Sequence, residues 1–225
     1  VDTKAPTATV TLASSALLAG QTTTVTITFS EAVAAFDSTV DVTVENGTLA
    51  AMTSGDGGIT WTGTFTPTTN IEETTNVVSL AASYTDVAGN AGTAATSANY
   101  TVDTKAPTAT VTLADSALKI GETSLVTITF SEAVTAFDST VDVTVQNGTL
   151  AAMTSGDGGI TWTGTFTPTT NIEDTTNVVS LATSYTDVAG NAGAAATSAN
   201  YTLETKAPTA TVTLADSALK IGETS

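Results

Sequence analysis

The chain is built from an internal repeat of 101 residues. The segment VDTKAPTATVTLA begins at Val1, returns at Val102, and starts a third time as LETKAPTATVTLA at Leu203. Residues 1–101 and 102–202 differ at positions 14, 18, 19, 21, 23, 24, 34, 45, 73, 82 and 93 of the first copy, eleven in all. Repetition at a fixed period is typical of an array of one structural unit. The sequence therefore predicts one repeat at 1–101, a second at 102–202, and the linker and first strand of a third at 203–225.

Each copy has the pattern of short β-strands. Segments rich in Val, Ile and Thr, most of them alternating apolar and polar residues, are separated by turn sequences such as ENG, SGDGG and DVAGNAG. We expect strands at 7–12, 22–29, 40–44, 48–53, 59–65, 77–84 and 96–102. Seven short strands in about 100 residues are typical of an immunoglobulin-like sandwich. The predicted fold class is all-β, with tandem Greek-key sandwiches joined into an elongated rod.

The charged residues exclude several classes of protein. The chain carries 22 acidic and 5 basic residues, a net charge of −17, and it contains no His and no Cys; all five basic residues are Lys. A Ser-His-Asp triad, a Cys nucleophile and a conventional zinc or copper site are therefore excluded. Nucleic acid and anionic membranes are poor partners for such a chain. No run of about 18 apolar residues is present, so we expect no direct membrane insertion.

Five motifs occur in the same order in both copies: VDTKAPT, TFSEAV, a turn of the form NGTL, TFTPTT and YTDVAGNAG. This ordered set resembles the bacterial Ig-like repeats of giant secreted adhesins, the type I-exported, RTX-tailed proteins of biofilm and of host or ice attachment. The resemblance implies extracellular extender modules at the bacterial cell surface, often stiffened by Ca²⁺ at the domain junctions. It also implies that the main partners are neighbouring repeats, with surface or biofilm-matrix contacts made through other domains.

The sandwich topology predicts where the acidic side chains gather, without reference to the family. The loops after the second, fourth and sixth strands return to the pole at which the first strand begins. We therefore expect oxygen ligands from the linker and these loops to surround a shared cation. The predicted set is Asp2, Glu31, Asp86 and Asn90 in the first copy, Asp103, Glu132, Asp187 and Asn191 in the second, and Glu204 at the start of a third. Ca²⁺ suits such loops better than Mg²⁺, because it accepts 6 to 8 oxygens in irregular geometry.

Other acidic residues support the site less directly. Asp37, Asp56, Asp138 and Asp157 lie in loops at the same pole and are further candidate ligands. For all of these positions an alternative stays open, because Asp and Asn beside Gly also form turns with no metal. Asp41 is expected on the outward face of a strand. The pair Glu72 and Glu73 is expected on the solvated surface at the opposite pole, where it could also help a junction from the other side.

The large side chains fit a core rather than a binding platform. Trp61 alternates with Phe65 along one strand, which predicts an inward position. Tyr84 and Tyr100 lie near strand ends and are expected to bond the backbone through their hydroxyls, as in a tyrosine corner. Leu17 is expected to be buried beneath its loop, and Asn46 to form a turn between two strands.

Three alternatives accompany the leading hypothesis of a calcium-stiffened stalk that projects an adhesive domain. A carbohydrate- or protein-binding module would need a distinct exposed patch, and the sequence shows none. A glycoside hydrolase could use Glu31 with Asp86, but it would need a cleft and stacking aromatics, and only 5% of the residues are aromatic. A strand-exchanged filament would use the segment after residue 203. We expect a non-enzymatic protein.

Overall fold

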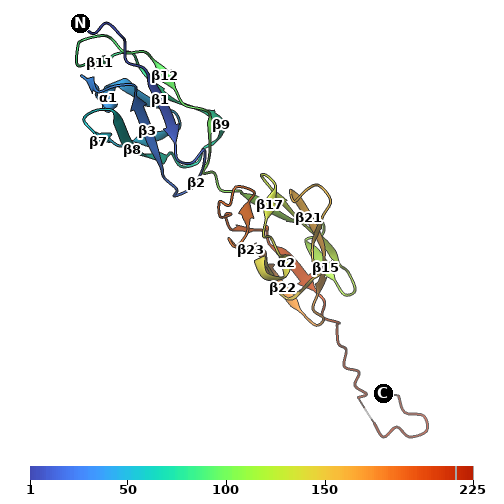
Figure 1. Cartoon of the computed structure of the whole chain (residues 1–225). Helices are drawn as coiled ribbons and strands as arrows, with labels where there is room; N and C mark the ends of the chain where they lie inside the picture. The colour runs from blue at the N-terminus through green and yellow to red at the C-terminus, as the bar shows by residue number, and fades with distance from the viewer. Residues whose placement is uncertain (216, 225) are drawn as a thin grey trace. The chain divides into compact units, whose positions relative to one another are not determined.

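The structure is a computed structural model, and it describes residues 1–215 and 217–224. The chain forms two compact units (Figure 1). The first unit comprises Val1–Ala109, Phe130–Phe137 and Ala182–Ala195, and the second comprises Thr110–Thr129, Asp138–Leu181 and Ala196–Ser225. No helix among the described residues is long and apolar enough to cross a lipid bilayer.

The first unit contains the whole of the first sandwich. Its elements are β1 (Ala8–Leu12), β2 (Ala16–Leu18), β3 (Thr23–Phe29), β4 (Val33–Ala34), α1 (Ser38–Asp41), β5 (Val42–Val44), β6 (Gly47–Leu49), β7 (Thr53–Ser54), β8 (Thr60–Pro67), β9 (Glu72–Asn76), β10 (Val78–Leu80), β11 (Thr85–Asp86), β12 (Ala95–Thr96) and β13 (Tyr100–Asp103). It also contains the two-stranded pair of β17 (Val134–Thr135) and β24 (Thr186–Asp187).

The core of the first sandwich lies between its sheets. One sheet has the order β1-β3-β8-β6, with β7 also on β8, while β12-β10-β5 and β2-β13-β9 form two further sheets. Alternation along β3 buries Val25, Ile27 and Phe29 and leaves the intervening threonines outside. These side chains pack with residues such as Val78 and Val102 from the other sheets. The predicted all-β sandwich is confirmed.

The large side chains lie as the sequence predicts. Leu17, Phe65, Tyr84 and Tyr100 are 0–1% exposed, and Trp61 is half-buried and packs against the core. Asn46 has φ of +51° in the turn between β5 and β6, which is the left-handed conformation that Asn tolerates. These predictions are confirmed.

Several elements were not expected from the sequence: the short strands β2, β4, β9 and β11, and the helical turn α1. β2 and β9 flank β13, although β9 has the polar sequence EETTN and all five of its residues are expected in a loop. Residues 38–41 form one helical turn, α1, rather than part of a strand. The expected outward position of Asp41 is therefore wrong: Asp41 is 4% exposed, and its carboxylate accepts hydrogen bonds from the Asp37 backbone N–H (2.8 Å) and from the Ser83 hydroxyl.

The second unit contains the corresponding elements of the second copy. They are β14 (Ala109–Leu113), β15 (Ala117–Lys119), β16 (Ser124–Phe130), α2 (Ser139–Asp142), β18 (Val143–Val145), β19 (Gly148–Leu150), β20 (Thr154–Ser155), β21 (Thr161–Pro168), β22 (Glu173–Asn177), β23 (Val179–Leu181), β25 (Ala196–Thr197) and β26 (Tyr201–Glu204); the end residues Ala109 and Phe130 belong to the first unit. The sheets β14-β16-β21-β19, β18-β23-β25 and β15-β26-β22 repeat the first pattern.

The described residues after Thr205 form no strand. Their sequence APTATVTL is the same as that of 106–113, where the strand β14 pairs with β16. Val212 is 90% exposed, whereas its equivalent Val111 is 6% exposed. The expected first strand of a third repeat is therefore absent among these residues, because a strand needs a partner for its backbone groups.

Candidate functional site: two acidic clusters

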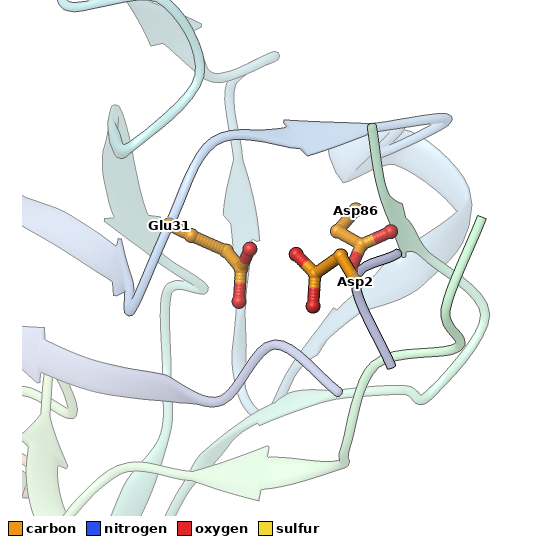
Figure 2. A group of neighbouring side chains, drawn as sticks. All are labelled: Asp2, Glu31 and Asp86. Atoms are coloured by element: carbon orange, nitrogen blue, oxygen red, sulfur yellow. The ribbon is translucent and has the colours of Figure 1, made fainter. Parts of the chain in front are cut away.

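Two groups of three carboxylates lie in the first unit. In each group, one carboxylate oxygen from each of the three residues lies within 4.8 Å of the other two. The first group is Asp2, Glu31 and Asp86, and the second is Asp103, Glu132 and Asp187. Figure 2 shows the side chains of the first group, with the carboxyl groups facing the space between them. The structure thus brings together six of the predicted ligands, at equivalent positions of the two copies.

Strand pairing places the first cluster. Glu31 follows the end of β3, and Asp86 ends β11, which pairs with β4 so that Asp86 lies opposite Val33. This pairing brings the two loops beside each other although they are 55 residues apart in sequence. Asp2 lies in the N-terminal segment and reaches the same place. Its backbone carbonyl accepts a hydrogen bond from the Asn90 side chain (3.3 Å). Asp86 is 2% exposed.

The YTDVAGNAG segment is a turn and a carrier of a ligand at once. Asp86 Oδ1 accepts from the Asn90 backbone N–H at 2.8 Å, and Gly89 has φ of +94°, a conformation that L side chains rarely adopt. At Gly92 an added Cβ would lie 2.2 Å from the Tyr84 ring. The two interpretations of this motif are therefore compatible, because the turn fixes the Asp86 carboxylate among the other two acids.

The two asparagines are oriented differently from the prediction. The amide nitrogen of Asn90, rather than its oxygen, faces the cluster and donates to Asp86 Oδ2 at 2.7 Å. Asn191 does the same, donating to Asp187 Oδ2 at 2.8 Å and to Asp103 Oδ1 at 3.0 Å. The oxygen of Asn191 accepts instead from the Ala19 backbone N–H at 3.1 Å, which fixes this orientation. Both amides therefore hold the carboxylates in place from outside the cluster.

The surroundings of the first cluster favour an ionised carboxylate more than those of the second cluster do. The side-chain hydrogen bond from Asn90 lowers the pKa of Asp86 below its usual range. In the second cluster, burial raises the pKa of both Asp103 and Glu132, and the neighbouring carboxylates raise it further. Loss of hydration and like charge both disfavour ionised carboxylates, and a bound cation would reverse both effects.

Glu72 and Lys105 lie beside the second cluster; for Glu72 help to a junction was the alternative to a surface position, whereas Lys105 was not expected there. Lys105 Nζ lies 3.0 Å from Glu72 Oε2, and both side chains are about half exposed. The negative charge of Glu72 contributes to the raised pKa of Glu132, and the positive charge of Lys105 opposes that effect. The pairing of β9 with β13, which was not predicted, brings Glu72 to this place.

The four further candidates have other partners. Asp37 and Asp138 cap the helical turns α1 and α2, accepting from the backbone N–H of Thr39 and Thr140 at 2.9 Å. Asp56 accepts from the backbone N–H of Thr60 at 2.9 Å, and this bond is the main cause of its low pKa of about 2. Asp157 forms the same turn in the second copy, also with a pKa of about 2. These four residues belong to neither cluster of described residues.

Glu204 occupies the position in β26 that Asp103 occupies in β13. It pairs with Lys119 of β15 and Glu173 of β22 across the sheet and is exposed. Among the described residues it belongs to neither cluster. Its predicted ligand role stays a prediction.

The fold and the two clusters define a tandem immunoglobulin-like protein with an acidic site at equivalent positions of each copy. The family model described as bacterial Ig-like domain matches residues 2–102 and 103–203. The chain therefore belongs to the bacterial Ig-like domain family. The first matched stretch contains Asp2, Glu31 and Asp86, and the second contains Asp103, Glu132 and Asp187.

Several solved structures are similar to the chain. An Escherichia coli adhesin, FdeC, is 17% identical with a TM-score of 0.41 over 87% of this chain and 62% of its own. The Yersinia pseudotuberculosis adhesin InvE is 18% identical with a TM-score of 0.35, over 87% of this chain and 58% of its own. The titin I-band fragment I67–I69 is 12% identical with a TM-score of 0.39, over 89% of this chain and 65% of its own. The chain thus spans about three fifths of the length of both adhesin structures. Among curated proteins, none matches the chain.

Proposed function

We propose that the chain is a segment of the stalk of a bacterial surface adhesin, in which Ca²⁺ bound at the two acidic clusters fixes the linker segments to the loops beside them. The observation that carries this proposal is the recurrence of the cluster. A linker aspartate, a loop glutamate and a turn aspartate lie within 4.8 Å of one another in both copies. The motifs resemble those of type I-exported, RTX-tailed adhesins, and the proposal includes secretion to the cell surface by that route.

The chemistry of each cluster suits Ca²⁺. Its ligands are all oxygens, and Ca²⁺–oxygen distances of about 2.3–2.6 Å allow two oxygens on one ion to be up to about 5 Å apart. The separation within each cluster meets this limit. Without a cation, each pair of carboxylates about 4 Å apart costs roughly 4 kcal/mol at an effective dielectric near 20. A divalent ion removes this cost and supplies a reason for three acids to converge.

The position of Asp103 suggests what the ion does. Asp103 is the last residue of β13, a strand held on both sides by β2 and β9. Glu132 lies just after β16, and Asp187 ends β24. An ion bound by these three residues would connect the end of β13 to the two loops and restrict the linker, in which Pro107 already fixes one φ angle. This restriction is how a string of repeats becomes a stiff stalk.

The proposed stalk does not need tight binding. Extracellular modules bind Ca²⁺ with dissociation constants of about 10⁻⁴ to 10⁻³ M, which suffices where free Ca²⁺ is in the millimolar range. The family match is to Ig-like domains rather than to a catalytic family. We therefore propose a mechanical, non-enzymatic role, with the adhesive contact made by another domain.

The test is calcium binding by the whole chain, measured by calorimetry after treatment with EGTA. We expect two sites, one lost in Asp86→Asn and the other lost in Asp187→Asn. Asp56→Asn removes the same charge from a turn outside both clusters and is the matched control. In small-angle scattering, Ca²⁺ should increase the maximum dimension relative to EGTA. An absence of binding heat, or scattering curves that Ca²⁺ leaves unchanged, would contradict the proposal.

A further inference from the structure

The outer face of the first sandwich's main sheet is made of threonines. Along β1, β3 and β8 every second residue faces the core, and the residues between them are threonines that lie on the other side. One threonine each from β6 and β7 completes the face. We call this set the threonine face; its members are Thr9, Thr11, Thr24, Thr26, Thr28, Thr48, Thr53, Thr60, Thr62, Thr64 and Thr66.

The strand registers order these threonines into rows. Thr9, Thr28 and Thr60 lie opposite one another across β1, β3 and β8. The next row, in the order of the strands across the sheet, contains Thr11, Thr26, Thr62 and Thr53. Two further pairs of opposite residues are Thr24 with Thr64 and Thr48 with Thr66. Opposite residues in neighbouring strands point to the same side of a sheet. The hydroxyls therefore repeat about every 4.8 Å across the strands and about every 6.6 Å along them.

The second unit repeats the threonine face with one change. Thr127 pairs with Thr163 and Thr129 with Thr161, as in the first copy. At the position of Thr24 the second copy has Leu125, which is 47% exposed and lies opposite Thr165. Each unit thus carries this face by itself.

The threonine face is uncharged in a strongly acidic protein. None of its members is ionisable, although the chain has a net charge of −17. Most of its hydroxyls have no protein partner among the described residues; Thr11 Oγ1 donates a long bond of 3.5 Å to the Thr26 carbonyl, and the Thr60 side chain at the end of the face bonds the Asp56 carboxylate. Each hydroxyl can both donate and accept a hydrogen bond. The surface therefore offers a dense set of neutral donors and acceptors.

Two possible occupants, a flat crystalline surface and a second copy of the chain, fit this face poorly. Neighbouring strands rotate by about 20–25°, so four strands turn the face by about 60–75°, which a flat crystalline lattice cannot follow. A second copy of the chain would bring together two molecules of net charge −17. The face of one sheet covers only about 500 Å², from strands of about 3.3 Å per residue and 4.8 Å apart, below the roughly 800 Å² per partner of a stable interface. A flexible, uncharged polymer can follow the twist of the sheet and is not repelled by the acidic protein.

From this face we infer that each repeat has a second binding surface, which takes a segment of an uncharged polysaccharide. Sugar hydroxyls are neutral donors and acceptors, and the threonine methyl groups supply apolar contact to the ring carbons. Thr side chains are stiff at χ1, so little side-chain entropy is lost on binding. Binding by one face is weak, on the order of millimolar. Because the repeats are linked in one chain, binding by one face raises the effective concentration of the polysaccharide at the next face, so the whole chain binds more tightly than one repeat.

The test is native affinity electrophoresis of the whole chain in gels that contain a soluble polysaccharide. Hydroxyethylcellulose and dextran are the uncharged probes, and carboxymethylcellulose is the charged counterpart of the first. We expect both uncharged polymers to retard the chain and carboxymethylcellulose to retard it at least threefold less. Valine variants in the middle rows, Thr26→Val with Thr62→Val and Thr127→Val with Thr163→Val, should weaken retardation at least threefold in combination. Leu125→Thr, which completes the second face, should strengthen it.

The controls separate the outcomes. Thr43→Val with Thr144→Val makes the same change at exposed positions in β5 and β18, outside the threonine face, and should leave retardation unchanged. Valine keeps the strand propensity of threonine, and thermal unfolding checks the fold of each variant. No retardation by either neutral polymer, or equal retardation by carboxymethylcellulose, overturns the inference. Concentration-dependent sedimentation that the valine variants abolish would assign the face to a second copy instead. Calcium binding should be unchanged throughout, so this inference and the proposed stalk function can fail separately.

Discussion

The hydroxyls of the buried tyrosines donate hydrogen bonds to the backbone in each sandwich. Tyr100 is 1% exposed and donates its hydroxyl to the Glu45 carbonyl at 2.5 Å. Tyr84 is fully buried and donates to the Thr93 carbonyl at 2.9 Å. The sequence position of both residues near strand ends predicted bonds to the backbone, and this prediction is confirmed. Tyr201 donates to the Gln146 carbonyl in the second copy as Tyr100 does to Glu45.

Removal of the Tyr100 hydroxyl should destabilise the first sandwich. Tyr100→Phe keeps the ring, whose centroid lies 5.4 Å from that of Phe65, but leaves the Glu45 carbonyl without this donor. We expect a loss of about 1 kcal/mol in the free energy of unfolding. Urea denaturation followed by tryptophan fluorescence measures it. Tyr201→Phe in the second copy is the matched variant, and an unchanged urea midpoint in both would contradict the assigned role of the bond.

The same tyrosines predict how stability depends on alkaline pH. Burial raises the pKa of Tyr100 and of Tyr201 to about 12, whereas an unfolded tyrosine titrates near 10. Because the folded-state pKa is the higher one, the unfolded chain loses its protons first as the pH rises. The contribution of these two tyrosines to stability should therefore be constant below about pH 10 and fall between about pH 10 and 12.

Tyrosine absorbance at high pH, recorded together with circular dichroism, tests this dependence. In the folded protein the phenolate signal of these two residues should appear with unfolding rather than before it. The double variant Tyr100→Phe and Tyr201→Phe should lose much of the alkaline destabilisation. Titration of all four tyrosines near pH 10 with the sheet signal intact would show that burial does not hold their protons.

At the scale of the elements, the turn after β11 depends on its second glycine. A Cβ at Gly92 would lie 2.2 Å from Tyr84 Cε2, and the side chain of Tyr84 is fully buried. Gly92→Ala should therefore destabilise the first sandwich by about 1–3 kcal/mol through overpacking. Gly55→Ala, where nothing lies within 4 Å of the added Cβ, is the control. Thermal unfolding distinguishes them, and an equal effect of the two substitutions would be inconsistent with the packing argument.

Hydrophobic periodicity predicted the long strands because they are buried on one side only. β3 and β8 alternate clearly, and their predicted positions differ from the observed ones by at most two residues at each end. β9 could not be predicted in this way, because its residues are polar and its strand exists only through pairing with β13. The helical turn α1 is too short for periodicity, and its cap Asp37 was the only local signal. Short elements depend on tertiary partners that the sequence does not show.

The candidate clusters were predictable for a topological reason. Once the strand order is assigned, the loops that carry Glu31 and Asp86 must lie at the same pole as Asp2, and the structure places them together. The direction of the Asn191 amide was not predictable, because it depends on the Ala19 backbone N–H, 172 residues away in the sequence. The alternation in TTTVTITF and TWTGTFT did not by itself reveal the threonine face, because its continuity across strands required the registers.

At the scale of the whole molecule, the net charge of −17 opposes the compact state. The described residues form one ion pair, Lys105 with Glu72, so internal neutralisation is slight. Screening by salt and coordination by Ca²⁺ should both stabilise such a chain, by different mechanisms. Salt acts on all 22 acidic residues through the Debye length, whereas Ca²⁺ acts at the two clusters.

These mechanisms predict two separable increases in the melting temperature. In EGTA, raising NaCl from about 0.01 to 0.1 M shortens the Debye length from about 30 to 10 Å, and the melting temperature should rise by a few degrees. At constant ionic strength, about 1 mM Ca²⁺ on sites with a dissociation constant near 10⁻⁴ M adds about 1.4 kcal/mol per site. That corresponds to a further rise of about 6 °C for a domain of this size. Mg²⁺ at the same concentration should give much less, because it requires a tighter octahedron and retains its water. If Mg²⁺ and Ca²⁺ gave the same rise, general neutralisation of charge would explain the effect, and specific coordination by the clusters would not.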